Sequence, residues 1–403
     1  MRQLFRFMFQ HGSHLLFGAI LMAMSSFGQT YFVSLYGQHL RQAFGLSDGG
    51  LGGLYAIGTV MSAITLTWAG RLIDYTTTRR FTLIVTALLV TACLLVSGAQ
   101  AAWMLCIGFY FLRLGGQGLM VHTALTATAR QFPLDAGKAL GAIALGLSLA
   151  QAVFPVMAVQ ISHVTGWRVA WLINAGILVA GVGVAMMFLP RGREAPLRTF
   201  RKRGEKKVRE ASLWKNRNLL LALPVVLASP FITTGFFFHQ VRLAGEKGWS
   251  LSWMAAWFIA YAVTQAISLL SFGPVIDRLT PRRLLPWFLM PQAAAMLALW
   301  LSSSQWVTPF YLIMTGISSA IASTLATALW VQLFGPEQLA RVRSAVEAGT
   351  VIASGASPVI MGVLIDHHVP MRMQALFCLI YILGSSLLAT RIKSGRKILS
   401  QEA

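Results

Sequence analysis

Acidic side chains are scarce in this sequence. Of 403 residues, 12 are aspartate or glutamate and 11 % are charged, whereas about a quarter of a soluble chain is charged. This deficit excludes an ordinary soluble protein. Cysteine is scarce too, and the three cysteines all lie in apolar stretches (Cys93, Cys106 and Cys378). Neither a disulfide framework nor a zinc site is therefore indicated.

Long apolar runs take the place of the missing charges. A bilayer core about 30 Å thick is crossed by about twenty helical residues, and the sequence contains twelve such stretches. They are residues 14–36, 50–69, 81–99, 102–128, 139–161, 168–189, 218–240, 251–272, 284–301, 307–330, 344–365 and 372–391. We therefore predict an all-α membrane protein with twelve transmembrane helices.

The net charge of +21 is distributed according to the side of the membrane. With the N-terminus in the cytoplasm, the cytoplasmic segments hold 27 Lys and Arg and the opposite side holds 5. This positive-inside pattern predicts a multi-pass protein of the cell (inner) membrane with both termini cytoplasmic. It also argues against nucleic acid as a partner. The first apolar stretch is too long for a secretory signal and lacks a cleavage site, so we interpret it as an uncleaved span.

One eleven-residue polar phrase occurs twice. Residues 70–80 (GRLIDYTTTRR) return as residues 273–283 (GPVIDRLTPRR), with six identical positions at an offset of 203. The same offset pairs Lys138 with Arg341, Gly146 with Gly349, and Pro155 with Pro358. One half of the chain is therefore a diverged copy of the other, which is typical of transporters.

The repeat divides the chain into three parts. Residues 1–189 and 218–403 are predicted to form two six-helix halves. Residues 190–217 form a linker that holds eleven Lys and Arg and no apolar periodicity. Such a segment cannot bury a core, so we expect it to lie on the cytoplasmic face in contact with anionic lipid.

These phrases and span 4 resemble signatures of the major facilitator superfamily. The two copies are similar to the family's loop 2–3 and loop 8–9 motifs, and residues 113–118 (RLGGQG) resemble its span-4 arginine motif. The resemblance covers the whole chain. It implies the family's twelve-helix fold in two pseudo-symmetric halves, and secondary transport by alternating access as a monomeric symporter or antiporter.

Two positions depart from the family pattern. Thr77 or Thr78 stands where the family usually has a glycine before the arginine pair. The span-5 motif is reduced to Phe154-Pro155, which weakens a reading as a typical drug antiporter.

The repeated phrase has a physical interpretation as a gate. Asp74 ends span 2, where its carboxylate can face the positive N-terminal end of a neighbouring helix, which the resemblance identifies as span 11. Gly70 allows close approach, and Arg79 and Arg80 can pair across the interface of the halves. Such a latch holds one conformer and must break in the other. By the repeat, a second latch at the start of span 5 comprises Gly273, Asp277, Arg282 and Arg283.

Arg113 is the one basic residue inside a span, where a charge is costly and usually functional. It lies roughly 16 Å along span 4, near the middle of the membrane. Its counterpart in the second half is Gly316, so symmetry does not require it. The family resemblance places spans 1, 4, 7 and 10 around a central cavity. We expect the substrate to contact Arg113, Gln117, Gln29, Tyr31, Gln151, Tyr261 and Gln265.

Arg113 lacks a counter-ion at its own depth. None of the 12 carboxylates falls in the middle of a span, and a buried unpaired cation is costly. The guanidinium can therefore face water, bind backbone carbonyls or await an anionic group of the substrate. We favour the last, which predicts a small organic anion or zwitterion.

The same absence limits proton coupling. His122 and His239 are the titrating groups within or near spans. His122 faces away from Arg113 and His239 lies near the outer end of span 7, so we interpret both as packed or interfacial residues. Proton coupling through the substrate and facilitated transport both stay open.

Two other functions compete with this prediction. Twelve Trp and 24 Phe residues could line the pocket of an exporter of drugs or amphipathic compounds. Seventeen Met and 8 His residues suggest a metal importer, but they are not clustered at helical spacing as a soft-metal site requires. No nucleophile–base or metal constellation of an enzyme is legible, and no cofactor is predicted.

Overall fold

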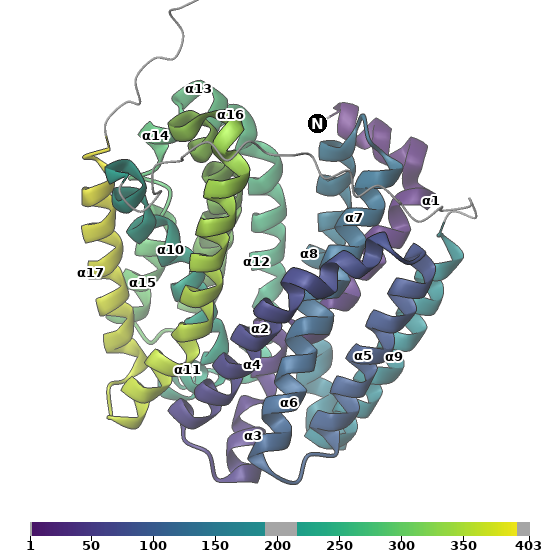
Figure 1. Ribbon diagram of the computed structural model, residues 1–403. Helices are drawn as coiled ribbons and strands as arrows, with labels where there is room; N and C mark the ends of the chain where they lie inside the picture. Colours follow the sequence, from purple (N-terminus) through teal and green to yellow (C-terminus); the bar gives the residue numbers. More distant parts are fainter. Residues whose placement is uncertain (1, 190–215, 393–403) are drawn as a thin grey trace, which may run out of the picture.

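The computed structural model describes residues 2–189 and 216–392. Within these ranges the chain forms helices and turns and contains no strand (Figure 1). The predicted linker, residues 190–217, lies almost wholly outside the described residues.

The N-terminal half runs from α1 to α9. Its elements are α1 (Arg2–Met24), η1 (Ser25–Gly28), α2 (Thr30–Val33), η2 (Ser34–Tyr36), α3 (Gly37–Phe44), α4 (Asp48–Ala69), η3 (Gly70–Asp74), α5 (Thr78–Ser97), α6 (Ala102–Leu112), η4 (Arg113–Met120), α7 (Val121–Gln131), α8 (Ala136–Thr165) and α9 (Trp167–Met187). The C-terminal half comprises α10 (Arg217–Phe238), α11 (Gln240–Lys247), α12 (Leu251–Ser271), α13 (Gly273–Leu279), α14 (Pro281–Leu284), α15 (Met290–Leu301), α16 (Val307–Asp366) and α17 (Met371–Ala389).

The all-α prediction is confirmed. Among the described residues, 11 helical stretches are long and apolar enough to cross a membrane, and the shorter apolar helix α15 takes the place of the twelfth. The predicted span 284–301 is helical mainly from Met290. Turns occupy residues 285–289, a stretch that contains Pro286 and is followed by Pro291, and proline lacks the N–H that a helical turn needs. The segment α16 contains two of the predicted spans, here Val307–Gly335 and Arg341–Asp366, and the chain leaves the helical conformation at Gly335, where φ is 78°.

The sequence repeat reappears as a repeat of backbone features. Gly45 and Gly248, which are 203 positions apart, end α3 and α11 in the left-handed conformation, with φ of 61° and 70°. Two residues later, Ser47 and Ser250 cap the next helices, each hydroxyl accepting from the backbone N–H three residues on, at 3.0 and 3.1 Å. Both copies therefore start their second long helix in the same way.

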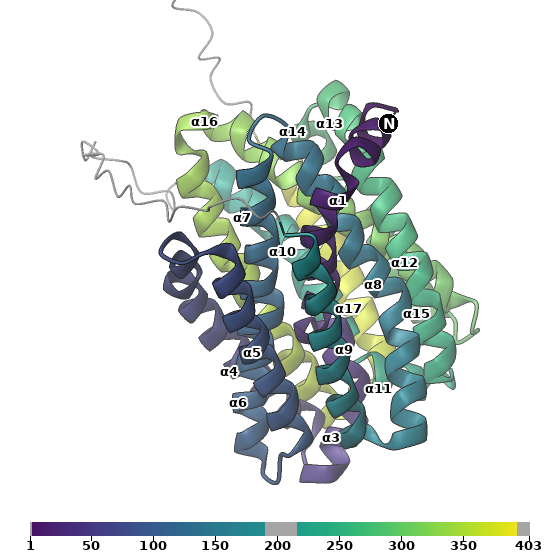
Figure 2. The ribbon, with the colours of Figure 1, turned by 90° about the vertical axis from the view of Figure 1, so that its right-hand side faces the viewer.

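Two crossings join the halves: α4 packs against α16, and α8 packs against α12. We call the side that holds the start of α1 and the end of α17 the terminal side, and the side with α3 and α11 the Asp48 side (Figures 1 and 2). The α4–α16 crossing is tight on the Asp48 side. A Cβ on Gly52 would lie 2.4 Å from the carbonyl oxygen of Pro358, and one on Gly362 would lie 2.6 Å from that of Asp48. The ribbons of the halves diverge toward the terminal side (Figure 1).

Candidate functional site

Arg113 opens an unusual stretch of span 4. Residues Arg113–Met120 form a π-helix, η4, between the α-helices α6 and α7, and such bulges are frequent at functional sites. Three glycines let η4 approach its neighbours. A Cβ on Gly115 would meet α5, one on Gly116 would meet η1 and one on Gly118 would meet α4.

Arg113 is buried against a break in span 1. The chain leaves the helix at Gln29, where ψ is 147°, and the carbonyl of Gly28 becomes available. Arg113 Nη1 lies 3.3 Å from that oxygen and 3.3 Å from the Thr30 hydroxyl. The guanidinium also lies over the ring of Tyr55, 5.3 Å from its centroid. Backbone carbonyls were one of the three environments expected for this cation.

The hydrogen-bonding capacity of Arg113 is only partly used. Its Nε is buried and has no partner, and among the described residues it forms no ion pair. Thr30 and Tyr55, which surround it, are hydrogen-bonded to each other at 2.8 Å and were not predicted as site residues. The break at Gln29 that brings Thr30 here has no clear sequence signal.

Three of the predicted residues meet in an aromatic layer between the halves. Tyr31 of α2 packs against Phe258 of α12, with ring centroids 5.8 Å apart. Tyr261 lies one turn further along α12, and its hydroxyl accepts from Gln265 Nε2 at 3.1 Å. Phe237 of α10 contacts both α12 rings, at 5.3 and 5.2 Å.

The other predicted residues are dispersed. Gln29 is half-buried at the break, and Gln117 is exposed within η4. Gln151 of α8 is buried, and its Oε1 has no partner. The assignment of all seven residues to the substrate stays a prediction.

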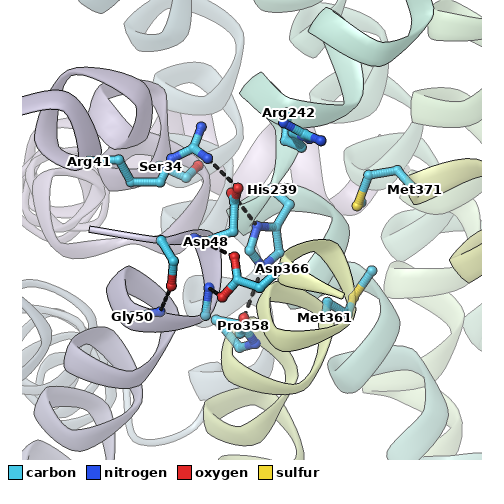
Figure 3. Close-up of polar contacts among 12 residues, drawn as sticks. Ser34, Arg41, Asp48, Gly50, His239, Arg242, Pro358, Met361, Asp366 and Met371 are labelled. Carbon is cyan, nitrogen blue, oxygen red and sulfur yellow. Dashed lines mark hydrogen bonds and ion pairs between the residues drawn. The ribbon is translucent and has the colours of Figure 1, made fainter. Parts of the chain in front are cut away.

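A polar cluster that the sequence analysis missed joins the halves on the Asp48 side. Asp48, at the start of α4, pairs with Arg41 and lies 3.6 Å from Nδ1 of His239 (Figure 3). Asp366, at the end of α16, accepts from the backbone N–H groups of Asp48 at 3.0 Å and Gly49 at 2.9 Å. We call Asp48, His239 and Asp366 the Asp48 lock. The only sequence signal was a carboxylate beside the end of each span, which also suits simple capping.

Further bonds across the interface surround this lock. Gln240 Nε2 donates to the carbonyl of Tyr31 at 2.7 Å and contacts the hydroxyl of Ser34 at 2.8 Å. The Ser34 hydroxyl in turn donates to the carbonyl of Phe237 at 2.7 Å. A hollow of about 630 Å³ lies beside the lock between α3 and α11. Its lining includes Arg41, Arg242 and Glu246.

The predicted gate residues lie on the terminal side. Asp74 is paired with Arg130 of its own half, and the carbonyl of Gly70 contacts His122 Nε2 at 3.1 Å. Arg79 and Arg80 are exposed at the start of α5. Asp74 bonds to Arg130 here, and its predicted contact with span 11 stays a prediction.

The second copy of the gate is only partly described. Gly273 and Asp277 belong to α13, but the surroundings of both lie outside what the structure describes. The backbone N–H of Arg282 donates to the side chain of Gln332 at 3.1 Å, and Arg283 is exposed.

Within the described ranges, no group of three or more His, Cys, Asp or Glu side chains could hold a metal ion. The candidate site therefore consists of a buried cation, an aromatic layer and the Asp48 lock.

Comparison with known proteins identifies the family. The Major Facilitator Superfamily matches residues 18–260 and 240–402 of this chain, so the chain belongs to that family. It is a multi-pass membrane transport protein for small solutes. No curated protein matches it.

Solved structures share the fold. A bacterial homologue of the human lysosomal transporter Spinster, in an inward-facing and occupied conformation, superposes with a TM-score of 0.67 at 15 % identity, covering 94 % of this chain and 96 % of that one. A mutant of the nucleoside transporter NupG superposes with a TM-score of 0.72 at 9 % identity, covering 94 % and 99 %. At these identities the likeness shows the fold alone.

Proposed function

We propose that this protein is a secondary transporter that carries a small organic anion or zwitterion through the membrane by alternating access. One observation carries the proposal: Arg113 is buried in span 4 with no carboxylate partner among the described residues and with an unpartnered Nε. A planar guanidinium matches a carboxylate better than it matches one carbonyl and one hydroxyl. An anionic substrate would supply the missing partner.

The neighbouring side chains support a site for a small organic molecule. Tyr31, Tyr261 and Gln265 offer ring faces and amide groups at the interface of the halves. Gln117 is exposed, while the glycines on either side of it pack against other helices. Gln117 therefore points away from α4, α5 and η1, as a residue facing a substrate path should.

Alternating access is supported by where the halves touch. Hydrogen bonds between the halves gather on the Asp48 side. On the terminal side, Trp68 of α4 is 62 % exposed, and Arg343 and Glu347 of α16 pair within their own helix. We infer that the positive-inside rule makes the terminal side cytoplasmic. The conformer is then inward-facing, with Asp74 released from span 11.

We propose a monomer in the cell (inner) membrane, with both termini in the cytoplasm and residues 190–217 on anionic lipid. It works as a symporter or antiporter with a proton as the coupling ion, or as a uniporter.

Thermal unfolding of the purified protein with a ligand panel tests the proposal. A ligand at about 100 times its dissociation constant adds about 2.7 kcal/mol to stability. We expect small carboxylates to stabilise the parent protein and not Arg113→Gln. Arg71→Gln is the matched control, because it removes an exposed arginine from η3. A stabilising carboxylate is then tested for flux in proteoliposomes.

If neutral or cationic amphiphiles stabilise the parent and Arg113→Gln alike, and carboxylates stabilise neither, the anion proposal is wrong. The exporter of amphipathic compounds then becomes the better proposal, with the aromatic layer as its pocket.

A further inference from the structure

The imidazole of His239 lies between two acceptors. The ring is 3 % exposed at the end of α10. Its Nε2 lies 2.8 Å from the carbonyl oxygen of Pro358, and its Nδ1 lies 3.6 Å from Asp48 Oδ1 (Figure 3). A carbonyl oxygen only accepts, so Nε2 carries a hydrogen.

The hydrogen on Nε2 determines the protonation state of Nδ1 in the neutral ring. In a neutral ring protonated at Nε2, Nδ1 presents a lone pair, and that lone pair would face the Asp48 carboxylate. The contact becomes favourable when one proton is added, either to Nδ1 or to the carboxylate. A proton added at this contact would be shared between His239 and Asp48.

The charges around the ring come from every element packed against it. From α4 comes Asp48, from α3 comes Arg41, from α16 comes Asp366 and from α11 comes Arg242. Arg41 already pairs with Asp48, Asp366 accepts from two backbone N–H groups of α4, and Arg242 pairs with Glu246. Histidine is the side chain whose charge changes most readily near neutral pH, and His239 is the histidine of the Asp48 lock.

Two contacts of the lock cross between the halves. Asp48 reaches from the N-terminal half to His239, and Asp366 reaches from the C-terminal half to the N-terminal end of α4. Opening the Asp48 side must break both contacts and admit water to the ring. The extra proton is then held only in the closed state.

We propose that His239 and Asp48 form a proton-binding site whose protonation closes the Asp48 side of the transporter. The proposal rests on the proposed alternating access. Because the closed state binds one more proton than the open state, acid favours closure and alkali favours opening. The proton enters and leaves on the Asp48 side, so the site sets the conformational equilibrium and adds no coupling ion to the cycle.

Distance measurements between spin labels test this site without any substrate. Labels at Gln100 and Ser303 suit the measurement, because both residues are exposed in equivalent loops of the two halves on the Asp48 side. The background replaces Cys93, Cys106 and Cys378 with alanine. In lipid nanodiscs the ratio of closed to open protein should fall by up to about tenfold per pH unit between pH 5.5 and 8, the limit for one proton.

Two variants and one control decide the outcome. His239→Gln keeps an N–H for the Pro358 carbonyl but cannot titrate. Asp48→Asn removes the negative charge that makes a proton on His239 favourable. Both should lose the pH dependence, and either alone is sufficient if the other fails to fold. His122→Gln is the matched control, because His122 binds the Gly70 carbonyl within one half, and it should keep the full shift.

Either of two results would overturn the inference: a parent protein whose distances do not change with pH, or a folded His239→Gln that shifts as the parent does. The pH-dependent distances do not depend on whether carboxylates stabilise the protein through Arg113. Failure of the substrate proposal and failure of the lock can therefore be told apart.

Discussion

The two halves share their scaffold and differ at their polar centres. Left-handed Gly45 and capping Ser47 have structural copies in Gly248 and Ser250. Arg113, by contrast, corresponds to Gly316, and at the offset of 203 His239 corresponds to Tyr36, whose hydroxyl accepts from Asn174 within its own half. The residues that shape helix ends are thus duplicated. The charged residue inside a span and the histidine of the Asp48 lock each occur in one half.

The crossings show the same contrast in their packing. Gly52 of α4 touches the backbone at Pro358, and a Cβ there would approach a carbonyl oxygen to 2.4 Å. The equivalent position of α12 is Ala255, which already has a Cβ. Gly52 therefore lets α4 and α16 approach more closely than an alanine, as at the equivalent position of α12, would allow. This close contact lies on the Asp48 side, which carries the lock.

The largest change in the balance of conformers should come from breaking this difference. Gly52→Val places side-chain atoms against the Pro358 backbone, and such overpacking costs about 1–3 kcal/mol. We expect the ratio of closed to open Asp48 side to fall by roughly five- to a hundredfold, measured with the Gln100–Ser303 label pair. Gly53→Ala is the matched control, because its Cβ meets Val359 at an ordinary 3.5 Å. An unchanged ratio in Gly52→Val would show that the tight contact does not govern closure.

Much of the scaffold could be predicted, because each span is a continuous apolar run and the repeat is legible at one offset. The Asp48 lock could not. Asp48 and Asp366 are 318 positions apart, and each alone reads as a helix-end carboxylate. The partners of Arg113 were also hidden, since they depend on the break at Gln29, and the single glycine before it, Gly28, does not by itself predict a break. Only tertiary packing brings these groups together.

The two copies end their third spans with different contacts. Arg168 Nη1 donates to the carbonyls of Ser97 and Ala99 at 2.7 Å each, and it stacks on Trp167. In the other half, two side chains share the corresponding hydrogen bonds. Arg372 donates to the carbonyl of Trp300 at 2.7 Å, and Lys247 donates to the carbonyls of Leu299 and Ser302. Burial, followed by the charge of Arg372, lowers the pKa of Lys247.

Alanine variants should separate these two arrangements. A hydrogen bond from a charged group contributes about 1.5–3 kcal/mol. Arg168→Ala removes two such bonds. Because Arg168 is exposed, we expect less than twice that contribution, a destabilisation of about 2–4 kcal/mol, and a smaller one for Arg372→Ala because Lys247 remains. Thermal unfolding in detergent gives both values. Equal losses would mean that the single contact of Arg372 matters as much as the pair made by Arg168.

The smallest effect is expected at the predicted gate. Asp74 and Arg130 are 43 % and 33 % exposed, so their ion pair contributes about 0–1 kcal/mol in this conformer. In the opposite conformer we expect Asp74 to face the positive end of span 11, where its charge is worth about 0.3–1 kcal/mol.

Asp74→Asn and Arg130→Gln distinguish these two roles. If the contact of Asp74 with span 11 outweighs its ion pair with Arg130, Asp74→Asn should raise the ratio of closed to open Asp48 side by up to about fivefold. Arg130→Gln should lower that ratio, because Asp74 loses its partner in the closed conformer. The same label pair reports both changes. Shifts in the same direction would mean that the Asp74–Arg130 ion pair only anchors the loop, and the gate would then have to lie in the second copy of the phrase.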